Sequence, residues 1–121
     1  MKTFLIFLLT LILIVSIVLL SYPSDEQSNS YKNLLTAKAD NAIEKGWVPA
    51  IIPESAYDIG ETHNLDTNVF YGSFYYEEKD EAILLKHLTP IEENDKTYTW
   101  KDILFHIDTK RHKVWYRNKV D

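Results

Sequence analysis

The pattern of apolar and polar positions divides the chain into one long apolar run and a mixed remainder. Residues 4–20 read FLIFLLTLILIVSIVLL, in which Thr10 and Ser16 are the only polar residues and none is charged. Extended to residues 3–22, the segment would form about 30 Å of helix, which matches the hydrocarbon core of a bilayer. The run therefore predicts a transmembrane signal-anchor helix over residues 1–22, with residues 3–22 in contact with the lipid bilayer.

A cleaved secretory signal peptide is the alternative interpretation of the same run. The apolar core of a signal peptide is usually about 7–15 residues long and is followed by a small-x-small cleavage motif. This run is longer, and cleavage after Ser21 or Ser24 would put Leu19 or Tyr22 where a small side chain is required. We therefore expect the helix to be retained.

The orientation of the anchor is indicated by the basic residues at its two ends. The amino terminus and Lys2 directly precede the run, whereas the first basic residue after it is Lys32. The positive-inside rule counts basic residues near the membrane and gives little weight to acidic ones. We expect a single-pass protein of a bacterial inner or plasma membrane, with its soluble domain outside the cytoplasm.

The remainder of the chain predicts a small α+β domain. The polar segment PSDEQSNS at residues 23–30 is typical of a linker, so the folded domain is expected over residues 31–121. The spacing of apolar residues predicts two helices, at 31–45 and 79–88, the second with an apolar face formed by Leu84, Leu85 and Leu88. The polar residues at 92–96 predict a loop. Alternation and β-branched or aromatic residues predict strands at 56–61, 68–76, 103–108 and 113–117, with 98–100 extending the third or standing alone. The expected fold is an N-terminal transmembrane helix followed by a small antiparallel sheet with two helices packed on one face.

Three local features refine this prediction. The first predicted helix has a common apolar face, formed by Leu35, Ala39, Ala42 and Ile43. Pro49 and Pro53 exclude a regular helix between them, so we expect an extended or single-turn connector that buries Trp47, Ile51 and Ile52. Gly72 lies inside the second predicted strand, which indicates a bulge or a close approach of two backbones.

Charge and composition exclude several classes of function. The chain has 13 basic and 18 acidic residues, a net charge of −5, which argues against nucleic-acid binding driven by charge. The absence of cysteine excludes a disulfide framework, a Cys-ligated metal centre and a lipidated N-terminal cysteine. One local reversal of charge, near the C-terminus, suggests either contact with anionic lipid or an acidic partner, or simply a solvated turn; it comprises Lys110, Arg111, His112, Lys113, Arg117 and Lys119.

The segment from residue 46 to residue 68, GWVPAIIPESAYDIGETHNLDTN, carries a resemblance to known proteins. Its run W-x-P-x-x-[IL]-P-x-S-A-x-[DN]-I, followed by H-[DN]-[LI]-D-[TS]-N and an aromatic strand, resembles a group of small, uncharacterised bacterial proteins with a membrane or lipid anchor. The resemblance implies the anchor and one compact α+β domain, and it implies no activity. Lipid-anchored members require a cysteine, which this chain lacks.

One polar constellation within this segment is a candidate ligand-binding site. Glu61, His63, Asp66 and Asn68 lie within eight positions, and on a strand Glu61 and His63 would share one face. Such a group could bind a ligand or divalent cation, or hold a histidine tautomer for acid–base chemistry. A structural role is favoured, because Asp and Asn in a turn accept backbone N–H bonds. The sequence contains no recognised metal motif, serine elbow or phosphate loop, so we predict no catalytic residue, metal ligand or cofactor.

The aromatic residues suggest a second kind of site. Most must form the core of so small a domain, but outward-facing Tyr71, Tyr75 or Trp115 would form an adhesive face for a protein partner. The leading hypothesis is a non-enzymatic, membrane-anchored interaction module, with an immunity-like or envelope accessory role as specific versions. The alternatives are a small metal-dependent or acid–base enzyme centred on Glu61, His63 and Asp66, and an accessory subunit that packs its anchor against a membrane complex.

Overall fold

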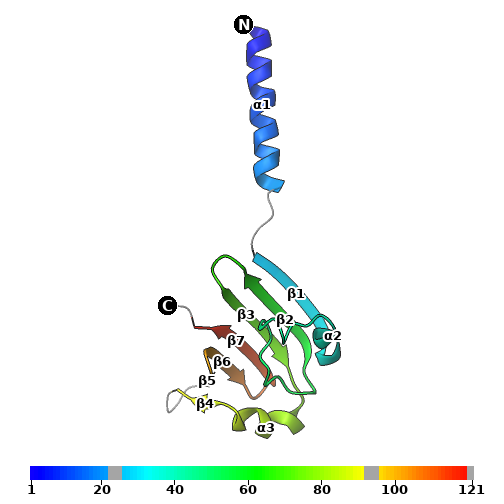
Figure 1. Ribbon diagram of the computed structural model, residues 1–121, viewed down its shortest axis with the longest axis vertical. Helices are drawn as coiled ribbons and strands as arrows, with labels where there is room; N and C mark the ends of the chain where they lie inside the picture. The colour runs from blue at the N-terminus through cyan, green and yellow to red at the C-terminus, as the bar shows by residue number, and fades with distance from the viewer. Residues whose placement is uncertain (22–25, 92–95, 120–121) are drawn as a thin grey trace.

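The structure, a computed structural model, describes residues 1–21, 26–91 and 96–119. An apolar helix stands apart from a head that is built on one seven-stranded antiparallel sheet (Figure 1). In chain order the elements are α1 (Lys2–Ser21), β1 (Glu26–Asn33), α2 (Leu34–Ala39), β2 (Tyr57–Asn64), β3 (Val69–Tyr75), η1 (Glu78–Asp80), α3 (Glu81–Lys86), β4 (Thr89–Pro90), β5 (Thr97–Trp100), β6 (Ile103–Asp108) and β7 (Lys113–Asn118). The strands lie in the order β1-β2-β3-β7-β6-β5-β4. The predicted α+β class is confirmed.

Helix α1 has the length and composition of a membrane span. The window Lys2–Leu19 has a mean hydropathy of 2.7, and none of it is buried in the protein. The hydroxyls of Thr10 and Ser16 each donate a 2.9 Å hydrogen bond to the backbone carbonyl four residues earlier. Because the two polar side chains within the apolar run, Thr10 and Ser16, satisfy their donors inside the helix, the middle of α1 presents an almost wholly apolar surface to its surroundings.

The core of the head lies between one face of the sheet and the segments that cover it. Ile59, Phe74 and Phe105 point from the sheet into this core, and Leu84 reaches it from α3. Residues from α2 and from the turns that follow it belong to the same cluster, including Leu34, Ala37, Ala42, Val48 and Ile52. The helices therefore pack on one face, as predicted, and no element among the described residues covers the other face of the sheet.

Strand β1 corrects the predicted linker. Residues 26–30 pair with β2 instead of forming a flexible connection, while residues 23–25 lie outside the described residues. The strand is polar because β1 is an edge strand, and Tyr31 is its one fully buried side chain. Polar contacts hold it in register, including a 2.8 Å hydrogen bond between the hydroxyls of Ser28 and Thr62. A strand of this kind lacks the apolar alternation that a sequence pattern can detect.

The first predicted helix is shorter and turns a different face to the core. It begins at Leu34 because Asn33 caps it, with the Asn33 side chain accepting the backbone N–H of Thr36. It ends before Asn41, which adopts a left-handed backbone (φ 59°) that no regular helix continues through. The predicted inner residue Leu35 is 77% exposed, and Leu34 and Ala37 are buried instead. The single-period helix over 31–45 is therefore wrong, because a strand and a turn interrupt it.

The other elements follow the prediction closely. The hairpin β6–β7 spans the predicted residues, with Ile103, Phe105 and Ile107 buried on one face. Tyr98–Trp100 belongs to a separate strand, β5. The second helix is divided into η1 and α3, and Leu84 and Leu88 are buried as expected. The loop predicted at 92–96 falls mostly outside the described residues.

Gly72 marks a close approach, one of the two roles predicted for it. A Cβ at this position would lie 2.3 Å from the backbone carbonyl oxygen of Gly60 and 2.5 Å from the hydroxyl oxygen of Tyr116. Only a residue without a side chain fits there. The register irregularity of this sheet lies elsewhere, between Tyr57 and Gly60 of β2.

Candidate functional site

Glu61 and His63 form a buried pair on the inner face of β2. Nδ1 of His63 lies 2.9 Å and 3.1 Å from the two carboxylate oxygens of Glu61. Asn29, directly opposite on β1, donates its side-chain amide to Oε1 of Glu61 at 2.6 Å. The alternation of β2 therefore places both residues on one face, as predicted, and the neighbouring strand supplies a third member from a segment far away in sequence.

Trp47 covers this pair from the segment that follows α2. Its ring stacks on the His63 ring, with centroids 3.6 Å apart and planes 8° from parallel. The backbone carbonyl of Trp47 accepts a 2.8 Å hydrogen bond from the hydroxyl of Tyr116 on β7. Burial, and then the nearby Glu61 carboxylate, raise the pKa of Tyr116 above its ordinary value, so the hydroxyl keeps its proton and remains a donor. Lys45 places its ammonium 4.8 Å from the Trp47 ring centroid. The cluster thus fixes the connecting segment onto the sheet.

One ring nitrogen of the cluster is left over. Nε2 of His63 is buried and has no hydrogen-bond partner among the described residues. In the neutral tautomer that donates Nδ1–H to Glu61, Nε2 would carry a lone pair, which is the arrangement by which a carboxylate orients a histidine for metal or acid–base work. The surroundings limit that chemistry, because Glu61 is 2% and His63 3% exposed and Trp47 lies across the ring. Within the described residues, no group of three His, Asp or Glu side chains is placed to hold a metal ion.

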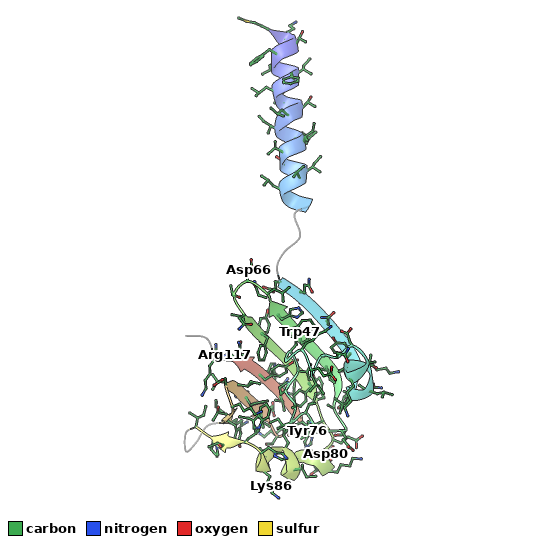
Figure 2. All side chains as sticks on the ribbon, viewed as in Figure 1. Trp47, Asp66, Tyr76, Asp80, Lys86 and Arg117 are labelled. Atoms are coloured by element: carbon green, nitrogen blue, oxygen red, sulfur yellow. The ribbon has the colours of Figure 1, made fainter. Side chains whose placement is uncertain are left out.

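The other two residues of the predicted constellation lie elsewhere. Asp66 and Asn68 belong to the exposed turn between β2 and β3, and Figure 2 shows Asp66 at the end of the head nearest α1. The side chain of Asn64 accepts the backbone N–H groups of Asp66 and Thr67 at 2.9 Å and 3.1 Å, and Asn68 adopts a left-handed backbone (φ 61°). Both residues serve the turn geometry. The structure therefore brings together Glu61 and His63 and keeps Asp66 and Asn68 apart from them.

An uncovered row of aromatic residues lies on the opposite face of the sheet. Tyr71 and Tyr75 of β3 stand opposite Arg117 and Lys113 of β7, and Trp115 lies between these two on the same face. Tyr71 is 47% exposed, and Tyr75 and Trp115 are partly exposed. These are the three aromatic residues for which an outward position would predict an adhesive face. We call this surface the open face.

Cations lie against the aromatic rings of the open face. The ammonium of Lys113 is 5.0 Å from the ring centroid of Tyr75 and 4.9 Å from that of Trp115. The guanidinium of Arg111 lies 5.6 Å from the Trp115 ring. Such cation–π contacts order long side chains that would otherwise move freely in solvent.

A shallow hollow occupies the middle of the open face. It has a volume of about 360 Å³ and is walled by Tyr71, Leu104, His106, Trp115 and Arg117. His106 contacts Trp115 with ring centroids 5.7 Å apart, and it lies opposite the core residues of β6, as predicted. The hollow is predominantly apolar with basic groups at its rim, which suits a protein side chain.

The predicted basic cluster is divided by the fold. Residues 110–113 lie at one end of the hairpin β6–β7, whereas Arg117 and Lys119 lie toward the other end. Arg111 is also paired with Asp108, at 2.9 Å. Lys113 pairs with Tyr75 of β3, Tyr75 pairs with Tyr57 of β2, and Tyr57 pairs with Asn33 of β1. Asn33 is the last residue of β1 and lies about 23 Å along the strand from Glu26. The turn therefore lies at the end of the sheet opposite the start of β1.

Sequence reasoning missed two members of the buried cluster. Asn29 fell in the predicted linker, and Trp47 was assigned to the core without a partner. No local pattern connects either residue with Glu61 or His63, because the contact depends on strand pairing and on the path of the connecting segment. A buried charge on an otherwise apolar strand face is the signal that could have led to a search for such partners.

Comparison with known proteins gives one match. Residues 25–75 match the family model described as the YbbD head domain. The matched segment contains β1 to β3 and with them the buried pair and Trp47, and it covers less than half of the chain. No curated protein and no solved structure matches. The similarity, together with the apolar helix that precedes it, fits a membrane-anchored module located outside the cytoplasm.

Proposed function

We propose that this protein is a single-pass membrane protein whose head binds a protein partner through the open face, without catalysis. The observation that carries the proposal is the row formed by Tyr71, Tyr75 and Trp115 on a sheet face that no helix covers. Tyrosine and tryptophan are favoured as interface anchors, because they bury a large area at little cost in conformational entropy.

The anchor supports this function by confining the head. Helix α1 carries no charged residue after Lys2, and only residues 22–25 separate it from β1. A head tethered in this way meets other proteins of the same membrane at a raised effective concentration, so a modest open face suffices for binding. The amino terminus and Lys2, the first residue of α1, favour a cytoplasmic N-terminus and a head outside the cytoplasm, in an inner or plasma membrane. The tryptophan–proline motif supports membership of the group of small anchored bacterial proteins that it resembles.

The enzyme alternative is centred on the unpartnered Nε2 of His63. It requires Trp47 to leave the His63 ring so that a metal or substrate can reach the nitrogen. Metal analysis of the purified full chain, with thermal unfolding in the presence of zinc, calcium or manganese, tests this alternative. A stoichiometric metal, or a stabilisation that His63→Phe abolishes, would favour the enzyme over the interaction module.

Site-specific photocrosslinking tests the interaction module directly. A photoreactive phenylalanine analogue at Tyr71 of the full chain, in native membranes, is expected to give one adduct of defined mass with another protein. Substitution Trp115→Ala in the same chain should weaken that adduct strongly, because it removes the centre of the row.

The matched control places the same crosslinker at Lys38, an exposed residue of α2 away from the open face. The proposal fails if Lys38 gives the same adduct as Tyr71, or if the only adduct at Tyr71 joins two copies of this chain. The second outcome would identify the open face as a surface for self-association.

A further inference from the structure

A groove lies at the end of the head opposite the anchor, separate from both the buried pair and the open face. It has a volume of about 500 Å³ and runs between the connecting segment, at residues 50–54, and the helical segment that contains Asp80, Ile83 and His87. Figure 2 shows Asp80 and Lys86 at this end of the head, away from α1. A volume of this size falls within the range of protein clefts that accept ligands.

The floor of the groove is apolar, and part of it is uncovered. Ile52 and Leu84 form its buried base, and Ile51 is partly exposed beside them. Ile83 is 61% exposed on the wall formed by α3. A helix of one and a half turns that leaves an isoleucine in solvent beside an apolar hollow provides a place for an apolar side chain from another molecule.

The two walls of the groove are held together by Ser55. Its backbone N–H donates to the carboxylate of Asp80 at 3.2 Å, and its hydroxyl accepts the backbone N–H of Glu77 at 3.0 Å. Hydrogen bonds from Ser55, first from its hydroxyl and then from its backbone N–H, lower the pKa of Asp80, so the carboxylate stays ionised. The groove is therefore preformed, and a fixed anion stands on one of its walls.

Two carboxylates and one histidine, His87, line the groove. Glu54 stands exposed on one wall and Asp80 on the other. Glu77, Glu78 and Glu81 lie on the same helical segment, where Lys79 is paired with Glu77 at 3.3 Å. After Lys2 the chain carries 12 basic and 18 acidic residues, so the local charge at the groove has the same sign as that of the whole head. A positively charged partner is attracted both at long range and at the rim.

We propose that this groove binds a basic amphipathic peptide segment of a partner protein. Apolar side chains of the segment enter the hollow beside Ile83, and its lysine or arginine side chains meet Glu54 and Asp80. Asp80 on the groove wall lies at the end of the head away from α1, so a partner that approaches that end from solution reaches the groove without meeting the bilayer (Figure 2). A purely apolar ligand would leave the acidic rim without partners, and an anionic ligand would be repelled by it.

Methyl NMR on the full chain tests this proposal. The chain, labelled at its isoleucine methyl groups, is placed in phosphatidylcholine nanodiscs and titrated with a 12-residue peptide of leucine and lysine at helical spacing. Empty nanodiscs measure the contribution of the lipid. We expect saturable shifts at Ile51, Ile52 and Ile83 and unchanged signals at Ile103 and Ile107, which lie in the sheet core.

Two exposed substitutions probe the two parts of the site. Ile83→Ser should weaken peptide binding about tenfold by removing apolar contact, and Glu54→Gln about fivefold by removing a rim charge. Their matched controls are Leu35→Ser and Glu44→Gln, both exposed and outside the groove lining. These controls should bind like the natural chain.

The outcomes separate this site from the open face. Trp115→Ala should leave peptide affinity unchanged, because Trp115 belongs to the open face and not to the groove lining. The proposal is overturned if a matched leucine–glutamate peptide binds equally well, if the shifts map outside the groove, or if Ile83→Ser has no effect. None of these results bears on the photocrosslinks expected at Tyr71.

Discussion

At the scale of single residues, the main finding is a carboxylate that the fold buries and satisfies. Glu61 accepts hydrogen bonds from Asn29 and His63, and Trp47 closes over the histidine ring. A buried charge is tolerated only with such partners, and removal of one member leaves the others without theirs. The pair therefore ties β1, β2 and the connecting segment together, whatever else it does.

Substitution of the carboxylate measures this role. Glu61→Ala should lower the free energy of unfolding by about 1–3 kcal/mol, because the buried His63 ring loses its acceptor and the partly buried Asn29 amide loses its partner. Glu61→Gln should cost less, since it keeps one acceptor oxygen. Urea unfolding of the full chain in detergent, followed by tryptophan fluorescence, gives both values, and Glu44→Ala on the surface serves as control. A change below about 1 kcal/mol in Glu61→Ala would contradict the role assigned to the pair.

A second residue-scale prediction concerns pH. The Arg111 side chain, followed by the backbone N–H of Arg111, lowers the pKa of Asp108 from 3.8 to about 2. Because the pKa is lower in the folded state, the stabilisation is present above pH 4 and is lost as the pH falls toward 2. Arg111→Gln should move the pKa of Asp108 back toward 3.8 without reaching it, because the backbone donors remain. Carboxyl NMR titration measures the pKa of Asp108, with Lys110→Gln as control. An unchanged pKa of Asp108 in Arg111→Gln would refute the effect assigned to the Arg111 side chain.

At the scale of elements, the sequence predicted best where apolar residues alternate or recur with a clear period. The hairpin β6–β7 and the segment η1–α3 have such patterns and lie where they were expected. Strand β1 has only Tyr31 as a buried residue and is held by polar side chains, so its sequence is indistinguishable from that of a linker. The predicted bounds of the first helix were wrong for a related reason. The Asn33 side chain caps its start, and the left-handed backbone of Asn41 limits its end.

The same reasoning explains what could be predicted of the candidate site. The shared face of Glu61 and His63 follows from the period of a strand, and it was predicted correctly. The separation of Asp66 and Asn68 from this face depends on where β2 ends, which a turn-rich sequence does not reveal to within a residue. Trp47 and Asn29 join through tertiary contacts that leave no local pattern.

The close contact of β2, β3 and β7 at Gly72 provides a prediction at the scale of elements. At Gly72 an added methyl group would meet the carbonyl oxygen of Gly60 and the hydroxyl of Tyr116, and a backbone atom cannot move aside easily. Gly72→Ala should therefore destabilise the head by about 1–3 kcal/mol through overpacking. Gly60→Ala is the matched control on the neighbouring strand, since nothing lies within 4 Å of its added Cβ. Thermal unfolding that ranks the two substitutions in the opposite order would show that the strands do not approach as described.

At the scale of the whole molecule, the short connection between α1 and β1 determines which end of the head lies near the anchor. Residues 22–25 connect Ser21 to Glu26, so the start of β1 lies at most about 18 Å from the end of α1. The pairing of Glu26 with Asn64 places the β2–β3 turn at the same end. Helix α3 and the turn between β6 and β7 lie at the end of the head away from α1 (Figure 1).

The arrangement of the whole molecule depends on a retained helix and an external head, and the absence of cysteine makes both measurable. A single cysteine in place of Lys86, an exposed residue at the far end of the head, should react in intact cells with a maleimide that cannot cross the membrane. A cysteine in place of Lys2 should react only after the cells are opened, because the positive-inside rule puts that end in the cytoplasm. Intact-mass measurement of the same membrane-bound protein should show a chain that still contains residues 3–22. Labelling in the reverse order would place the head in the cytoplasm, and a mature chain that begins after Ser21 and is found free of membranes would identify the run as a cleaved signal. The first result would place the open face among cytoplasmic partners, and the second would remove the tether that raises the effective concentration of the head. Binding of the basic peptide to the groove would remain testable in either case.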